Sequence, residues 1–188
     1  MTLRRGFKKE ANDYAREFRK ELGLAAHDPL CPWQLAEHLA IPVVPMSEFA
    51  AVMAAEHLAY FSGSGQSVFS AATVFHGTRR LIVHNDNHHP NRQAANLAHE
   101  LAHGILGHPP SPPLDDHGCR NFDRTIEDEA NWLGPALLIS EEAAMHIVET
   151  GMTHARATQV YKVSRDLLLM RLGVCGAERR VARRRARW

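Results

Sequence analysis

Cysteine is scarce in this sequence, which contains three among 188 residues. Cys31, Cys119 and Cys175 lie far apart, and no two of them form a Cys-x-x-Cys pair. This spacing argues against a disulfide framework and indicates reduced thiols, as in a cytoplasmic protein.

Long apolar runs are also missing. No stretch reaches the roughly 18 apolar residues that a membrane-spanning helix requires. Residues 1–10 are basic, but charged amphipathic sequence follows them in place of the apolar segment of a signal peptide. We therefore expect neither a membrane span nor a secretion signal.

Net charge is small, because 22 basic and 21 acidic residues give a formal charge of +1. This balance hides an asymmetry, since residues 177–188 hold six arginines and one glutamate. The length and the hydrophobic fraction of 45% suit one globular domain with a small appendage. We expect a main domain over residues 1–150, a further segment over 151–176 and a flexible basic tail over 177–188.

Histidine, by contrast, is frequent, with 13 copies, and two of them form the motif His99-Glu100-Leu101-Ala102-His103. The motif lies in a largely apolar stretch, residues 93–106, that is predicted to be helical. Residues four apart share a helix face, so both histidines can bind one zinc ion. Glu100 lies about 100° around the helix, where it can reach a water molecule beside the metal. A chance match is the alternative; the apolar setting favours a metal site, because buried imidazoles need partners.

A catalytic zinc site usually has three protein ligands and a water molecule, so a third ligand is needed. The candidates are Glu127 and Glu129. We favour Glu127, because Asn131 lies four residues further on the same face, where it can hold the free N–H of a ligand histidine. Asp128 and Glu129 are then interpreted as solvated helix charges or as partners of the dipole at the helix N-terminus. No cysteine lies near the motif, and this favours an open catalytic site over a closed structural one.

Helices and strands are both predicted, which indicates an α+β fold. Strand propensity favours residues 58–62, 67–75 and 79–84, the last two as an antiparallel hairpin. Two prolines confine the extended residues 41–45 to a sheet edge or a loop. A sheet edge beside the metal can hold an extended peptide, and the sequence does not show which strand forms it. The expected helices cover residues 7–22, 32–39, 47–55 (capped by Ser47), 90–106 (opened by Pro90 or its neighbour), 122–138 (interrupted near Gly134-Pro135) and 140–149, with a proline-rich loop at 109–113 and an exposed loop at 114–120.

Together these motifs resemble the ImmA/IrrE metallopeptidases. In that family a pattern of the form Asn-x-x-His-x-x-x-Arg precedes His-Glu-x-x-His, and Glu-x-x-Ala-Asn follows it. The resemblance covers the chain to about Gly176 and departs at Trp132-Leu-Gly-Pro135, where the family more often has an aromatic residue followed by alanines. The matching positions here are Asn85, His88, Arg92, the motif at 99–103, and Glu127 to Asn131.

The resemblance implies a gluzincin-like metallo-endopeptidase, with a small, mainly antiparallel sheet packed on a helical core. His99, His103 and Glu127 would hold a zinc or manganese ion, and Glu100 would be the general base. The implied substrate is a specific protein, a helix-turn-helix repressor whose cleavage switches on stress-response or mobile-element genes. The competing interpretations are a regulatory DNA-binding protein and a toxin-like protein, each with a sensory or structural metal site.

The role of the remaining histidines stays open at this point. Tyr60, His84 and His108 are candidate donors for the oxyanion that peptide hydrolysis forms, and the sequence does not choose among them. A second metal site is conceivable, but no ligand spacing links its candidates, so we interpret them as surface or capping side chains. Those candidates are His88, His89, His108, His117 and Cys119.

Residues 153–176 predict two short helices joined at Val163-Ser164, the arrangement of a helix-turn-helix unit. Arg165 and Arg171, with the arginines of the tail, are suited to weak contact with nucleic-acid phosphates. The alternative is that the helices complete the core and the tail is disordered. We favour that alternative, because no aromatic residues are interleaved with the arginines.

Overall fold

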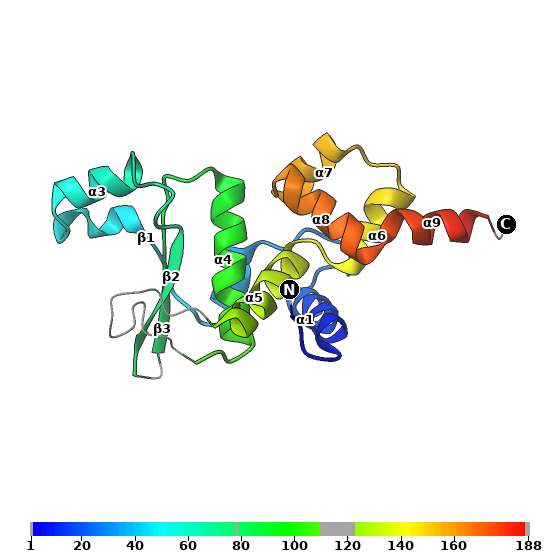
Figure 1. The fold of residues 1–188 in the computed structure, drawn as a ribbon, viewed down its shortest axis with the longest axis horizontal. Helices are drawn as coiled ribbons and strands as arrows, with labels where there is room; N and C mark the ends of the chain where they lie inside the picture. Colours follow the sequence, from blue (N-terminus) through cyan, green and yellow to red (C-terminus); the bar gives the residue numbers. More distant parts are fainter. Residues whose placement is uncertain (1, 78, 110–122, 187–188) are drawn as a thin grey trace.

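The computed structural model describes residues 2–77, 79–109 and 123–186 (Figure 1). The predicted α+β fold is confirmed: the chain is mostly helical and contains one small three-stranded sheet. The sheet lies at one end of an elongated molecule and the C-terminal helices lie at the other. Within these described residues, no helix is long and apolar enough to cross a membrane.

Two N-terminal helices form where the apolar periodicity predicts them. Helix α1 (Phe7–Glu21) buries one face, on which Phe7, Ala11 and Ala15 are fully inaccessible. Helix α2 (Pro32–His38) begins at a proline, whose fixed φ suits the first helical position. Both helices pack around the same hydrophobic cluster as the motif helix.

The sheet is mixed, with strand order β1-β3-β2. Strands β2 (Ala71–His76) and β3 (Arg79–His84) form the predicted antiparallel hairpin, in which Ala71 pairs with His84. Strand β1 (Val43–Pro45) pairs in parallel with β3, at the edge position that its prolines predict. The other edge is β2, which starts four residues later than expected.

The predicted strand at residues 58–62 is wrong. Those residues belong to helix α3 (Ala55–Ser62), and the 3₁₀-helix η1 (Met46–Ala51) precedes it. A short apolar run does not distinguish a strand from a helix. Here the helix starts at Ala55, after Ala54 at the N-cap position, and the apolar run continues it. The predicted cap is wrong as well, because η1 begins at Met46 without a side-chain cap and the Ser47 amide donates to Asp86.

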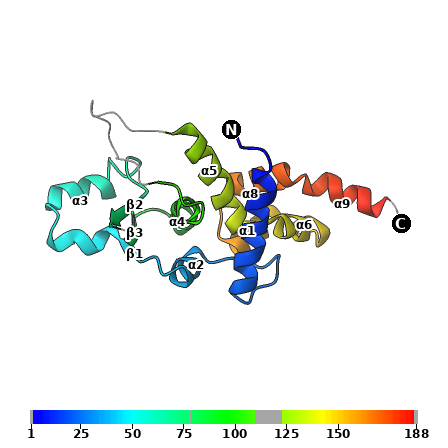
Figure 2. The ribbon, with the colours of Figure 1, turned by 90° about the horizontal axis from the view of Figure 1, so that it is seen from below.

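The motif helix α4 (Pro90–Ile105) begins at Pro90, as expected, and helix α5 (Arg124–Leu138) crosses it. Figure 2 views α4 nearly end-on, with the strands on one side and α5 and α1 on the other. The two helices touch at Gly134, where a Cβ atom would lie 3.1 Å from the backbone N and Cα of His99. A larger residue would force the helices apart, so glycine sets their spacing.

The predicted interruption of α5 at Pro135 is wrong, since the helix continues to Leu138. Proline lacks the backbone N–H donor, but the helical hydrogen bonds continue beyond it, since the Ile139 amide donates to the Pro135 carbonyl. The end of α5 is held by Arg19, a fully buried residue of α1 whose guanidinium donates to the carbonyls of Leu137 and Leu138. Residues 110–122, which include part of the predicted loop and His117 and Cys119, lie outside the described residues.

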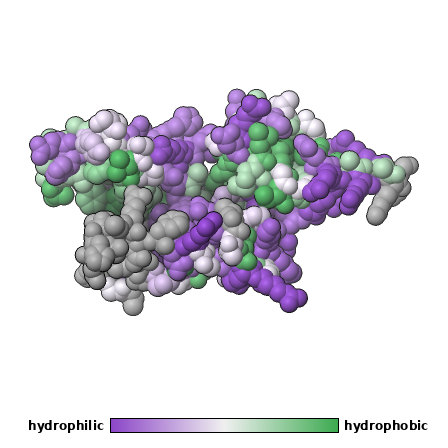
Figure 3. Space-filling model, viewed as in Figure 1, coloured by the Kyte–Doolittle hydropathy of each residue, from purple (hydrophilic) through white to green (hydrophobic). Residues whose placement is uncertain are grey.

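Four further helices follow in the described residues 139–186: α6 (Glu141–Glu149), α7 (His154–Tyr161), α8 (Arg165–Cys175) and α9 (Ala177–Arg185). Ser140 and Ser164 cap α6 and α8, as expected. A second hydrophobic cluster joins all four helices to Ala98 of α4 and Leu138 of α5. Figure 3 shows hydrophobic surface over α7 and α8; on α8, Leu169, Met170 and Val174 are each more than a third exposed.

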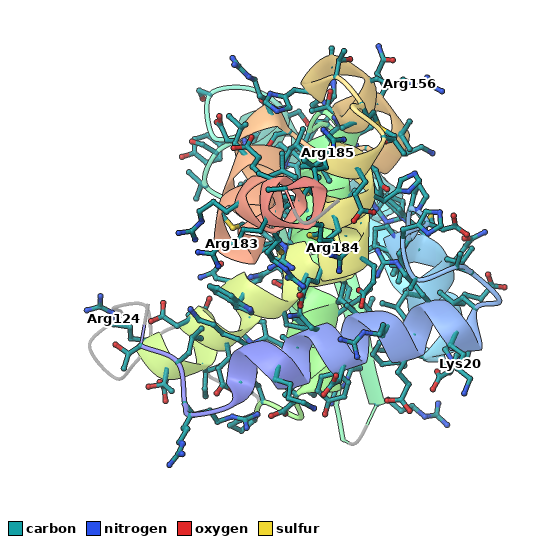
Figure 4. The ribbon with its side chains drawn as sticks, turned by 90° about the vertical axis from the view of Figure 1, so that its right-hand side faces the viewer. Lys20, Arg124, Arg156, Arg183, Arg184 and Arg185 are labelled. Carbon is teal, nitrogen blue, oxygen red and sulfur yellow. The ribbon has the colours of Figure 1, made fainter. Side chains whose placement is uncertain are left out.

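The prediction of a flexible, disordered tail is wrong for residues 177–185, which form α9. Val181 is only 3% exposed and anchors the helix in the C-terminal cluster. Arg180 and Arg184 pair with Glu141 and Glu149 of α6. Figure 4, which looks along α9, shows its last arginines around the helix end. The number of arginines does not reveal that Val181 is buried or that Glu141 and Glu149 pair with two of the arginines.

Candidate metal centre and active site

Three side chains from two helices converge on one point. His99 and His103 come from successive turns of α4, and Glu127 comes from the first turn of α5. One ligand atom from each lies within 4.8 Å of the others. The predicted ligand set is therefore brought together, and within the described part of the chain it is the one such cluster of three or more residues.

The separations suit one metal ion held between the three side chains. The two Nε2 atoms of His99 and His103 are 3.1 Å apart; His99 Nε2 lies 3.4 Å from Glu127 Oε2, and His103 Nε2 lies 3.6 Å from the other oxygen, Oε1. Ligand atoms about 2.0–2.1 Å from a tetrahedral zinc ion lie about 3.3–3.4 Å from one another, so each histidine meets one Glu127 oxygen at close to this separation. Two imidazoles and one carboxylate could therefore hold one divalent metal ion.

The protonation states also suit metal binding. Burial, together with the neighbouring His99, lowers the pKa of His103 to about 4. A hydrogen bond with His99 is the main cause that lowers the pKa of Glu127. At neutral pH the site thus offers a neutral His103 imidazole and an ionised Glu127 carboxylate, the forms that bind metals.

Glu100 lies beside this cluster and contacts the sheet. The Thr73 hydroxyl donates a hydrogen bond of 2.6 Å to Glu100 Oε2. Thr73 belongs to β2, the edge strand, so the predicted base is positioned between the metal centre and the sheet edge. Sequence reasoning did not find Thr73, because a hydroxyl inside a strand carries no motif.

The hydrogen-bonded support of His103 differs from the prediction. Asn131 is exposed and, among the described residues, makes no hydrogen bond with either ligand histidine. Instead, His103 Nδ1 lies 2.9 Å from His108 Nδ1, and His108 Nε2 lies 3.3 Å from Glu129 Oε2. When His103 Nε2 faces the metal, its Nδ1–H donates to His108, whose Nε2–H then donates to Glu129.

Glu129 is therefore not the solvated charge that we predicted. It is 8% exposed, and Arg4, which precedes α1, donates to its Oε1 at 2.8 Å. Arg4 also pairs with Glu10. The chain of contacts from the ligand thus runs through His108 and Glu129 to the N-terminal segment. The signal in the sequence was His108 itself, five residues after His103 at the end of the motif helix.

The other motif residues hold the segment that leads into β2. Asn85 is fully buried, and its side-chain amide donates to the carbonyls of Phe61 and Phe69. His88 Nε2 lies 2.7 Å from the Gln66 carbonyl, and Arg92 donates to Ser70 Oγ. These residues fix the edge strand relative to α4 and do not join the metal cluster.

The candidate oxyanion donors are not brought to the site as a set. His108 is engaged by His103 and Glu129. Tyr60 is 48% exposed on α3, and its ring stacks edge-on with Phe61. Burial lowers the pKa of His84, which lies edge-on to Trp33 with its Nδ1 unpartnered among the described residues.

Comparison with known proteins agrees with this geometry. A search of curated proteins finds no significant match. The IrrE N-terminal-like domain of the M78 peptidases matches residues 36–173, which include α4, α5 and the whole His99, His103 and Glu127 cluster. The match covers well over half of the chain, and the three converging ligands lie inside the matched range. The chain therefore belongs to the M78 metallopeptidase family.

Proposed function

We propose that this metallopeptidase is a zinc-dependent endopeptidase that cleaves one specific protein. The observation that carries the proposal is the convergence of His99, His103 and Glu127 on one point, with Glu100 hydrogen-bonded to an edge strand beside them. Zinc is favoured over manganese, because two imidazoles and one carboxylate form a zinc ligand set, whereas manganese prefers more oxygen ligands.

Peptide hydrolysis then divides among the residues of the chain. A bound zinc ion would lower the pKa of water to about 7 and polarise the scissile carbonyl. Glu100 accepts the proton of the attacking water and donates it to the leaving amine. Thr73 occupies one carboxylate oxygen of Glu100 and leaves the other oxygen for this transfer. Glu127 and the two histidines would hold the ion.

The free edge of β2 supports a protein substrate. The sheet order leaves one side of β2 without a partner strand among the described residues. An extended peptide can add to such an edge through main-chain hydrogen bonds. Since Thr73 lies on β2 and contacts Glu100, a peptide paired there would run past the base.

The resemblance favours a helix-turn-helix repressor as this protein substrate, cleaved in the cytoplasm to release stress-response or mobile-element genes. An edge strand selects extended segments, so the expected cleavage site is an exposed, extended segment of that repressor. The substrate is the part of the proposal that a direct cleavage assay must establish.

A DNA-binding role through the C-terminal helices is the weaker candidate. Arg171 of α8 is 1% exposed, and Arg180 and Arg184 of α9 are paired with glutamates. The exposed face of α8 carries apolar side chains, including Leu169 and Met170. Phosphate contacts require free, exposed cations; Arg165, Arg179 and Arg183 are exposed, but Arg171 is not, and the apolar side chains on α8 make this surface the weaker candidate.

Cleavage in cells tests the proposal. The full chain is co-expressed with repressors encoded beside its gene, and the products are separated by size. We expect one defined cleavage, lost in Glu100→Gln, with zinc still bound, and lost together with zinc in His99→Ala. Glu17→Gln, the same change at an exposed position of α1, is the matched control and should retain cleavage. Undiminished cleavage by Glu100→Gln would refute the assignment of the base.

A further inference from the structure

A cavity between the N-terminal and C-terminal helices contains polar groups that lack partners. Its volume is about 150 Å³, and Lys8, Asn12, Trp132 and Arg171 are among its lining residues. The atoms Asn12 Oδ1, Trp132 Nε1 and Arg171 Nη2 are buried and have no hydrogen-bond partner among the described residues. The cavity is separate from the metal centre, whose ligands do not line it.

Arg171 is the most unusual of these groups. It is 1% exposed, and its Nε donates to the Ile139 carbonyl at 2.9 Å. No carboxylate of the described chain lies within ion-pair distance, because Glu141, which also lines the cavity, is paired with Arg180. Burial lowers the pKa of this guanidinium. A buried charge is costly unless it is paired.

Arg19 shows how this chain satisfies a buried arginine in the absence of an anion. Like Arg171, it is almost completely inaccessible, and no carboxylate of the described residues forms an ion pair with it. Yet its three nitrogens all donate to backbone carbonyls, including those of Ala15, Asp28 and Leu137. Arg171 has one such bond and an unpartnered Nη2 that lines a cavity.

The charge around the cavity favours an anion. Arg180 and Glu141 cancel one another as an ion pair, which leaves the positive charges of Arg171 and Lys8. The Lys8 ammonium lies 4.5 Å from the centre of the Trp132 ring. Two N–H donors, from Arg171 and Trp132, are thus available to the oxygens of one ligand.

We propose that this cavity binds a hydrogen phosphate ion. Water occupies about 30 Å³ per molecule, so the cavity takes a ligand of about five heavy atoms, the size of phosphate. Asn12 selects among oxyanions: its Nδ2 donates to Glu141 Oε2 at 2.9 Å, so its free Oδ1 needs a donor. Hydrogen phosphate carries a P–OH group that can donate to Asn12, whereas sulfate carries no proton at neutral pH.

Binding would connect parts of the chain that are far apart in sequence. Asn12 lies on α1, Trp132 on α5 and Arg171 on α8. One ion that contacts all three would fasten the C-terminal helices to α5, which also carries Glu127. The proposal concerns a site outside the peptidase chemistry and does not depend on zinc.

The indole N–H of Trp132 provides a direct readout. Phosphate is titrated into the full chain at constant ionic strength while the indole resonances are followed by NMR, and Trp132→Phe identifies the resonance of Trp132. We expect a saturable shift of that resonance, a parallel rise in melting temperature and no comparable response to sulfate. An unchanged resonance would show that the cavity holds water only, and an equal response to sulfate would also overturn the proposal.

Paired lysine variants on α1 make the test independent of folding. Lys8→Gln should weaken phosphate binding about fivefold, the effect of one exposed charge at close range. Lys20→Gln removes the same charge from the far end of α1 (Figure 4) and should bind like the wild type. Arg171→Met should abolish binding. Equal affinities for the two lysine variants would refute the site.

Discussion

His103 contacts His108, which in turn contacts Glu129. From these contacts we predict that residues outside the metal centre affect its affinity for zinc. Glu129→Gln keeps the shape of the side chain and removes the charge that accepts from His108 Nε2. His108→Ala removes the acceptor for His103 Nδ1–H altogether. Both side chains are almost fully buried, so water does not replace the lost partner easily.

The expected loss is about 10- to 100-fold in zinc affinity, which is roughly 1.4–2.7 kcal/mol. Arg4→Gln should cost less, under about fivefold, because the Arg4 side chain is 49% exposed and solvent screens its pair with Glu129. The wild type should therefore bind zinc most tightly, followed by Arg4→Gln and then Glu129→Gln, and His108→Ala should bind it most weakly.

Competition with a chromophoric chelator at neutral pH measures these affinities directly. Glu17→Gln, an exposed carboxylate change on α1, is the control and should match the wild type. Circular dichroism of the zinc-free proteins separates loss of metal affinity from loss of fold. Zinc affinities within twofold of wild type for both His108→Ala and Glu129→Gln would show that the contacts from His103 through His108 to Glu129 do not support zinc binding.

Three further predictions concern the fold and the histidine. Gly134→Ala should destabilise the protein by about 1–3 kcal/mol, because the new Cβ would meet the His99 backbone at 3.1 Å; Gly173→Ala, with open space around it, should stabilise α8 by up to about 1 kcal/mol in the same thermal melts. Val181→Asp places a charge at a 3% exposed position and should undock α9, which limited proteolysis after the α9 arginines would detect; unchanged protection would contradict the docking. The zinc-free protein should lose stability as pH falls from about 6.5 to about 4. In this range His103 takes up a proton in the unfolded protein but not in the folded protein, where its pKa is lowered to about 4. His103→Gln should flatten that part of the stability–pH curve.

The ligand set could be predicted because it depends on local spacing. His99 and His103 share a face of any helix, whatever the helix packs against. Glu127 required only the assumption that the next long helix returns to the motif. The hairpin of β2 and β3 was predictable for the same reason, since its turn joins two runs of strand-forming residues.

The errors arose where distant residues decide the outcome. Residues 58–62 are apolar enough for a strand, yet the sheet uses β1 as its third strand, and α3 buries none of its side chains. Glu129 was interpreted as a surface charge because its partners, His108 and Arg4, lie 21 and 125 positions away. Tertiary packing overrides local propensity in each case.

Helix α5 contacts α4 on one side and the N-terminal residues Arg4 and Lys8 on the other. Glu127 and Gly134 are seven residues apart, so they share a face, and both meet α4: one at the metal centre, the other against the His99 backbone. Glu129 and Trp132, three residues apart, share the opposite side, where Arg4 and Lys8 contact them. The spacing of the α4 and α5 helices fixes the separation between Glu127 and the histidines, so a substitution on the α1 side changes zinc affinity only by shifting α5 as a whole or by acting through His108.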